Sequence, residues 1–155
     1  MNHEPMTLRE FTLTRTYDAP RDLVWKAWTE PEQLARWWGP EGMTTPLHTI
    51  ETDVRPGGAF RLTMVLDADG TEFPTEMAFR EVVEPERLVY EWEAQRGLGA
   101  GELIVTFTDL GDKTELTTHF SGYATDAIIE MANLGWAQQL DKLATHLTAN
   151  QLGGD

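Results

Sequence analysis

The hydrophobic pattern is most regular in the last long segment of the chain, residues 125–149. Its apolar residues recur at steps of three and four, which places them along one face of an α-helix. This stripe comprises Ile129, Ala132, Trp136, Leu140, Leu143 and Leu147. Polar residues such as Glu130, Asp141 and Thr145 occupy the opposite side. A helix of about 25 residues is roughly 37 Å long, so it needs an equally long apolar surface on which to pack.

Most of the preceding chain alternates between apolar and polar residues, which is the two-residue period of a β-strand. The segments with this pattern are 8–17, 44–53, 60–66, 73–79, 88–92, 103–107 and 116–120. Each has one apolar face, as expected for an antiparallel sheet with one face in water and the other against the core. The pattern therefore predicts seven strands that supply the surface for the long helix.

Two short helices are predicted between the first two strands. Pro20 suits the first turn of a helix. Thr29 and Glu32 match a capping box, so a second helix follows that carries Trp37 and Trp38 and ends at the next Gly-Pro pair. The fold class predicted is α+β: a curved seven-stranded antiparallel sheet wrapped around a long C-terminal helix, with two short helices after the first strand.

Composition and charge limit the classes of protein. The length of 155 residues predicts one domain, 1–155, with a core at about 8–149, short flexible tails and a flexible glycine-rich link at 97–101. The chain has no cysteine, so disulfides, a thiol nucleophile and thiolate metal sites are excluded. A net charge of −14 disfavours nucleic-acid and membrane-surface partners. No apolar run approaches the ~20 residues of a membrane-spanning helix, and the N-terminus lacks a signal-peptide pattern, so we expect a cytoplasmic protein. The sequence leaves both a monomer and a homodimer open.

Candidate catalytic chemistry is sparse. The four histidines, at positions 3, 48, 119 and 146, show no metal-ligand spacing, and no catalytic triad order, phosphate loop or dinucleotide fingerprint is present. We therefore expect no metal and no cofactor. Glu81, Tyr90 and His119 are the residues on which acid–base chemistry in a cavity would depend. Alternation along its strand directs His119 toward the wet face. Glu81 shares the parity of the inward-facing Met77 and Phe79, but side chains at strand ends often point to solvent, which is the orientation we expect for Glu81.

Five segments in order carry a resemblance to a known family. They are Ala19-Pro20 with Val24-Trp25, Ala35-Arg36-Trp37-Trp38-Gly39-Pro40, Asp53-Val54-Arg55-Pro56-Gly57-Gly58, Glu81-Val82-Val83-Glu84-Pro85-Glu86-Arg87-Leu88, and Gly135-Trp136 leading to Leu140-Asp141-Lys142-Leu143. Over about residues 8–149 the chain resembles the activator-of-heat-shock-protein-90-ATPase homologue family. That family belongs to the START-like (SRPBCC) superfamily, which shares the Bet v 1-like helix-grip fold. The resemblance implies a hydrophobic cavity between sheet and helix.

The resemblance does not imply a reaction, because function belongs to the site rather than to the fold. Members of the superfamily bind lipids, sterols or hormones, cyclise polyketides, or act as co-chaperones. The leading hypothesis is that the chain binds a small hydrophobic molecule in the cavity. The residues expected to line it are Trp37, Met64, Met77, Phe79, Trp92, Met131 and Trp136. The alternatives are an enzyme of the cyclase or hydrolase kind in the same cavity, and a protein-interaction module related to the co-chaperones.

Three positions leave local alternatives open. Trp37 and Trp38 are 100° apart on a helix, so we expect one of them in the core and one near the cavity. Gly135 interrupts the long helix at a cost of about 1 kcal/mol relative to alanine. It leaves room either for a neighbouring segment to pack closely, which the pattern favours, or for a ligand.

Overall fold

The computed structural model describes residues 6–94 and 99–152. Eight strands form one sheet: β1 (Thr7–Tyr17), β2 (Met43–Thr44), β3 (Glu51–Thr52), β4 (Ala59–Leu66), β5 (Glu72–Val83), β6 (Arg87–Trp92), β7 (Gly101–Asp109) and β8 (Thr114–Ala124). The helices are α1 (Arg21–Thr29), α2 (Pro31–Trp37), the short 3-10 helix η1 (Leu47–Thr49) and α3 (Asp126–Leu152). Parts of the predicted link at 97–101 and of the predicted tails lie outside the described residues.

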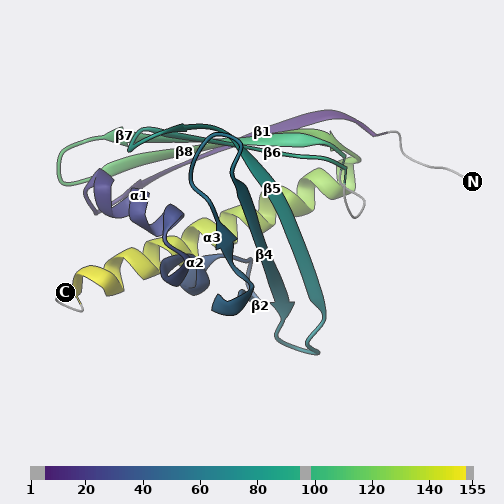
Figure 1. Cartoon of the computed structure of the whole chain (residues 1–155), viewed down its shortest axis with the longest axis horizontal. Coiled ribbons are helices and arrows are strands. Elements are labelled where there is room, and N and C mark those ends of the chain that lie inside the picture. Colours follow the sequence, from purple (N-terminus) through teal and green to yellow (C-terminus); the bar gives the residue numbers. More distant parts are fainter. Residues whose placement is uncertain (1–5, 95–98, 153–155) are drawn as a thin grey trace, which may run out of the picture.

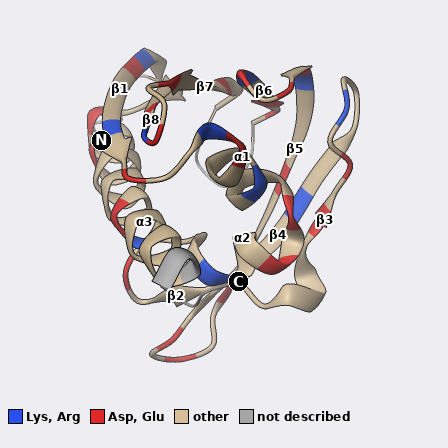
Figure 2. Ribbon diagram, turned by 90° about the vertical axis from the view of Figure 1, so that its left-hand side faces the viewer, with Lys and Arg blue, Asp and Glu red and all other residues tan. Residues whose placement is uncertain are grey.

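The sheet is antiparallel and wraps around the helices. Its strands follow the order β1-β8-β7-β6-β5-β4-β2, and β3 pairs with β4 off this path. In Figure 1, α3 runs beneath the sheet from the upper right to the lower left, with α1 and α2 beside its second half. Figure 2 shows β1 and β4 on opposite sides of the molecule, with α1 between them. The predicted α+β fold, with a long terminal helix held by a curved sheet, is confirmed.

The second predicted strand, 44–53, is wrong in its extent. The segment is instead divided into β2, η1 and β3, of which the two strands are only two residues long. Pro46 has no backbone N–H for a sheet ladder, and it begins the 3-10 turn, with the N–H of Thr49 donating to its carbonyl oxygen. The Thr49 hydroxyl then accepts a hydrogen bond from the N–H of Thr63 on β4. The alternating pattern therefore covers a turn between two very short strands.

The helix stripe predicted from the sequence is confirmed in α3. Leu140, Leu143 and Leu147 are buried, while the residues of the stripe nearer the N-terminal end are partly buried against the same core. The Tyr17 hydroxyl donates a 2.9 Å hydrogen bond to the carbonyl oxygen of Leu140 and so joins the end of β1 to α3. Burial raises the pKa of Tyr17 well above its usual value, so the hydroxyl stays a donor. The helix thus has a fixed position along the sheet.

The capping box predicted at Thr29 and Glu32 does not form. The Thr29 hydroxyl donates to the carbonyl oxygen of Trp25 within α1, at 2.9 Å. Glu30 is the N-cap of α2 without a side-chain capping bond, and Pro31 occupies the first helical position. A proline at that position needs no N–H partner and has a helical φ already, so α2 begins immediately after α1 ends.

We expect His146, which is buried on α3, to make stability depend on pH. Its Nε2 lies 3.1 Å from Oε1 of Gln33 on α2. Desolvation first, and then the charge of Arg36, lower the pKa of His146 below its ordinary value. The unfolded chain therefore takes up this proton at a higher pH than the folded chain. The resulting contribution to stability is present above pH about 6.5, falls as the pH drops through that value, and stops changing below the lowered native pKa.

Urea unfolding at a series of pH values tests this expectation. The His146→Gln variant should lose less stability than the wild-type protein as the pH falls from about 7.5 to about 5, since glutamine has no proton to gain there. Equal losses in the two proteins over that range would show that another group sets the pH dependence.

Candidate ligand-binding cavity

A cavity of about 270 Å³ lies between α3 and the sheet. Its wall is made by Trp38, Pro40, Met64, Thr75, Met77, Trp92, Leu103, Phe120, Met131, Ala132, Gly135, Trp136 and Gln139. These residues come from β4, β5, β6, β7, β8, the first half of α3 and the loop after α2. The volume lies just below the range of about 300–1,000 Å³ that is typical of small-molecule sites. The cavity therefore suits a molecule about the size of a fused two-ring aromatic compound.

Five of the seven residues predicted to line a cavity lie in this wall. Met64, Met77 and Trp92 contribute from the sheet, and Met131 and Trp136 contribute from the helix. Met131 is 72% exposed, so the cavity meets solvent near the beginning of α3. Thioether and aromatic side chains of this kind adapt to apolar ligands of varied shape.

Trp37 and Phe79 lie outside the cavity wall, contrary to the prediction. Trp37 is fully buried, with its Nε1 donating a 2.9 Å hydrogen bond to the carbonyl oxygen of Ala27 on α1. The cavity is lined instead by Trp38, because α2 ends at Trp37 and the next residue has extended backbone angles, φ −69° and ψ 134°. Phe79 faces inward but packs between Phe60 and Tyr90, with ring centroids 6.0 and 4.9 Å away respectively.

The loop that carries Trp38 and Pro40 is fixed to α3 by polar contacts. Lys142 Nζ donates to the carbonyl oxygens of Gly39, at 3.0 Å, and Met43, at 3.2 Å. The N–H groups of Gly39 and Glu41 donate to the side-chain oxygens of Gln139 and Gln138. Burial lowers the pKa of Lys142, against the opposing effects of Asp67 and Glu41. These contacts hold one side of the cavity in place.

Gln139 is a polar cavity residue that the sequence pattern did not single out. It is 4% exposed, and its Oε1 accepts the 2.9 Å hydrogen bond from the N–H of Gly39. Its Nε2 has no hydrogen-bond partner among the described residues. The available signal was its position three residues after Trp136 and four before Leu143, which places a polar side chain on the apolar face.

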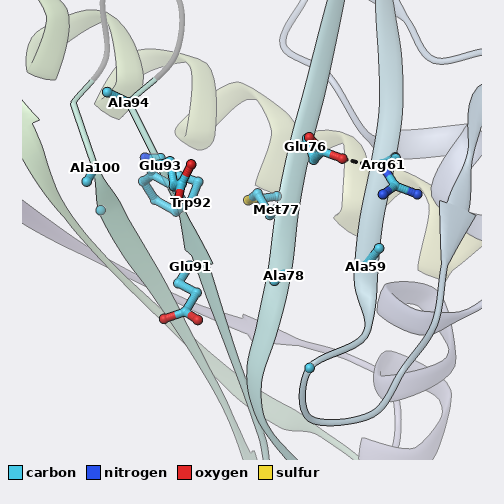
Figure 3. Close-up of a pocket in the computed structure, with 12 residues that line it drawn as sticks. Ala59, Arg61, Glu76, Met77, Ala78, Glu91, Trp92, Glu93, Ala94 and Ala100 are labelled. Atoms are coloured by element: carbon cyan, nitrogen blue, oxygen red, sulfur yellow. Dashed lines mark hydrogen bonds and ion pairs between the residues drawn. The ribbon is translucent and has the colours of Figure 1, made fainter.

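A second, more polar groove of about 720 Å³ lies against the other side of the sheet. Pairing between β5 and β6 begins at Ala78 opposite Glu91, so residues 72–77 of β5 pair with β4 alone. Figure 3 shows β5 and β6 separated at this point, with Met77 on one strand and Trp92 on the other. Both residues line the groove and the cavity. The two hollows therefore meet at the Met77 and Trp92 side chains.

The residues considered for acid–base chemistry do not line either hollow. A β-bulge between Phe79 and Glu81 shifts the register, which directs Glu81 outward, where its carboxylate lies 3.4 Å from Arg87. His119 is on the outer face, as predicted, with its Nδ1 2.8 Å from the Thr12 hydroxyl. Tyr90 is fully buried, and its burial raises the pKa of its hydroxyl far above the neutral range. None of the three could exchange a proton with a molecule in the cavity.

The part of the chain that the structure describes has neither a cluster of metal-ligating side chains nor a helix suited to cross a membrane. No group of three or more His, Asp or Glu side chains is close enough there to hold a metal ion. Over the same residues, none of the helices combines the length and apolar character that crossing a bilayer requires.

Gly135 lies in the cavity wall next to the loop after α2. A β-carbon added there would lie 3.7 Å from Cβ of Pro40, an ordinary packing distance. The structure thus places the glycine both against a neighbouring segment and beside the cavity. Gly135→Ala is expected to raise the free energy of unfolding by about 1 kcal/mol, because alanine has the higher helix propensity. Urea unfolding measures this, and a variant less stable than the wild-type protein would show that the added methyl does not fit.

The architecture defines the class of protein: the helix-grip fold, in which a curved antiparallel sheet holds a long terminal helix beside a cavity. Residues 18–148 match the family model described as "Activator of Hsp90 ATPase homolog 1-like protein". Since the match covers most of the chain, this protein belongs to that family, as the sequence motifs indicated.

Solved structures of bacterial proteins share the fold. A Chromobacterium violaceum protein is 29% identical with a TM-score of 0.79, and 89% of this chain and 96% of that one are covered. A Nitrosomonas europaea protein is 26% identical with a TM-score of 0.78, covering 91% and 95%. The AHSA1 protein of Silicibacter pomeroyi is 21% identical with a TM-score of 0.78, covering 92% and 99%, a likeness that concerns the fold alone. Comparison with curated proteins gave no match.

Proposed function

We propose that this protein binds a small hydrophobic molecule in the cavity between α3 and the sheet. The observation that carries the proposal is the wall itself, in which three methionines, three tryptophans and Phe120 surround a space of about 270 Å³. The cavity meets solvent near Met131, so its apolar wall is in contact with water rather than with protein, which is unfavourable. Filling it with an apolar molecule would recover contacts that the wall lacks.

The charged groups nearby support a neutral ligand rather than an ionic one. Among the described residues, no lysine, arginine, aspartate or glutamate lines the cavity. An ion would therefore lose its water without gaining a partner of opposite charge. In the outer groove Arg61 already pairs with Glu76, as Figure 3 shows, and with Glu51 at 3.2 Å.

The outer groove is also part of the proposal, as the route by which the molecule reaches the cavity. It is lined by polar and apolar groups in similar measure and meets the cavity at Met77 and Trp92. A rotation of the flexible Met77 side chain would widen the connection without breaking a strand pair, because Met77 has no partner on β6.

Native mass spectrometry of the protein purified from its own host tests the proposal. We expect a discrete additional mass under native conditions that is lost on denaturation. The Ala132→Leu variant should lack this mass, because the larger side chain occupies the cavity, whereas Ala127→Leu at an exposed position of the same helix should retain it. A bound mass retained equally by both variants would place the ligand elsewhere and contradict the proposal.

A further inference from the structure

We infer that the ligand carries a neutral oxygen acceptor, such as a ketone, ester, amide or hydroxyl oxygen, and that the Nε2 amide of Gln139 donates a hydrogen bond to it. The inference rests on the proposed cavity function and specifies the chemical class of the ligand. Its basis is an unpartnered polar group, almost completely buried, in a wall that is otherwise nearly all apolar.

The orientation of the Gln139 amide follows from its contact with the loop. The backbone N–H of Gly39 can only donate, so the side-chain atom that faces it at 2.9 Å must be the oxygen. The –NH₂ group is therefore the end left without a protein partner. Gly39 has a φ of +109°, a conformation that favours glycine, and Lys142 binds its carbonyl oxygen. The loop cannot easily turn to offer Nε2 an acceptor.

A buried donor without a partner costs about 1–3 kcal/mol. Burial at 4% exposure limits solvation of the Gln139 amide by bulk water. Gln139 lines the cavity, but Nε2 itself has almost no accessible surface. A ligand oxygen that displaces the atoms covering Nε2 would remove this cost, whereas a pure hydrocarbon in the same position would keep it. The site should therefore distinguish molecules of equal shape by whether they carry an acceptor.

The opposite wall is consistent with an oriented ligand. Thr75 on β5 is the other residue of the wall with a hydroxyl or amide side chain, and it is only partly buried. The Trp136 ring lies one helical turn before Gln139 on α3. A molecule whose apolar body lies against Trp136 and Met77 can thus direct an oxygen at Gln139.

Two naphthalene probes of nearly equal shape test the inference. 2-Acetylnaphthalene has a carbonyl oxygen where 2-isopropenylnaphthalene has a CH₂ group. We expect the wild-type protein to bind the ketone about five- to tenfold more tightly, the ratio that one hydrogen bond of about 1 kcal/mol or slightly more provides. Quenching of tryptophan fluorescence reports binding, because Trp38, Trp92 and Trp136 line the cavity.

Matched glutamine variants assign the preference to one amide. Gln139→Met should abolish it, so that the ketone and the hydrocarbon bind this variant with equal affinity. Gln138→Met should retain the ketone preference, although this substitution also removes a hydrogen bond to the loop, the one that the N–H of Glu41 donates to Gln138. Should Gln139→Met fail to fold, Gln139→Glu can be measured at about pH 9, where an ionised carboxylate still accepts from Gly39 but has no proton to donate.

The outcomes separate the two proposals. Equal affinity for the two probes in the wild-type protein, or the same ketone preference in both methionine variants, would overturn the Gln139 inference and leave cavity binding intact. Failure of both probes to bind any of the proteins would overturn cavity binding for ligands of this size, and the inference with it.

Discussion

Replacing Trp28 by alanine is expected to lower the free energy of unfolding by about 3–5 kcal/mol, the usual cost of truncating a fully buried tryptophan. Trp28 has no exposed surface. Its ring contacts the rings of Trp37, Trp38 and Phe107, with distances between ring centroids of 4.8, 6.0 and 6.2 Å respectively. It also stacks on Trp136, with centroids 6.0 Å apart and planes 5° apart. The residue therefore joins α1, α2, α3 and β7 at one point.

Thermal and urea unfolding of Trp28→Ala measure this cost. For a domain of this size a loss of 3–5 kcal/mol corresponds to a melting temperature lower by about 6–20 °C. A loss below about 1 kcal/mol would contradict the central position assigned to the ring.

Replacing Trp28 or Trp37 by phenylalanine provides a finer comparison, because Trp28 Nε1 has no partner among the described residues whereas Trp37 Nε1 donates to the carbonyl oxygen of Ala27. Trp37→Phe should be the more destabilising, by on the order of 1 kcal/mol.

Replacing Trp136 by alanine is expected to weaken both ligand binding and stability. Trp136 is partly buried, stacks on Trp28 and meets Trp38 edge-on at 5.3 Å. Since part of its surface is already exposed, we expect a loss of about 2–4 kcal/mol, somewhat less than for Trp28. It also lines the cavity, so the affinity for 2-acetylnaphthalene should fall at least about tenfold, or about 1.4 kcal/mol.

Trp25→Ala is the matched control for this variant. Trp25 is buried against Phe107, at 5.3 Å between ring centroids, and does not line the cavity. Its truncation should lower stability by a similar amount while the folded protein keeps its affinity. Affinity is compared at a temperature at which both variants are folded. Wild-type affinity in a folded Trp136→Ala protein would remove Trp136 from the proposed site.

The sequence pattern was sufficient for the larger elements because their burial is periodic. The stripe that ends with Leu140, Leu143 and Leu147 identified α3, and alternation identified the six long strands. Local chemistry was less informative where two structures compete for the same residues. The Thr29 hydroxyl closes the end of α1 rather than capping α2. Pro46 begins a 3-10 turn inside a segment that alternates like a strand.

Predictions for the site failed where backbone geometry departs from regular periodicity. Trp38 lines the cavity because α2 has already ended at Trp37. The sequence prediction treated both residues as helical, 100° apart, and so could not give the direction of Trp38. The parity that Glu81 shares with Met77 and Phe79 does not hold, because a bulge reverses the alternation of β5 after Phe79. Glu81 points outward, as expected for the end of a strand. Gln139 was missed because its importance arises from one contact with Gly39, far away in sequence. The apolar members of the wall were more accessible to prediction, since inward-facing parity alone selects Met64 and Met77.

The most direct measurement of the central claim is an NMR titration of the protein, labelled with ¹³C at the methionine methyl groups, with 2-acetylnaphthalene. We expect the signals of Met64, Met77 and Met131, which lie in the cavity wall, to shift together and to saturate at one ligand per chain. Met43 on β2 lies outside the cavity wall and should shift less than these three. Three cavity signals that stay unchanged, or a Met43 shift as large as theirs, would contradict binding in the cavity.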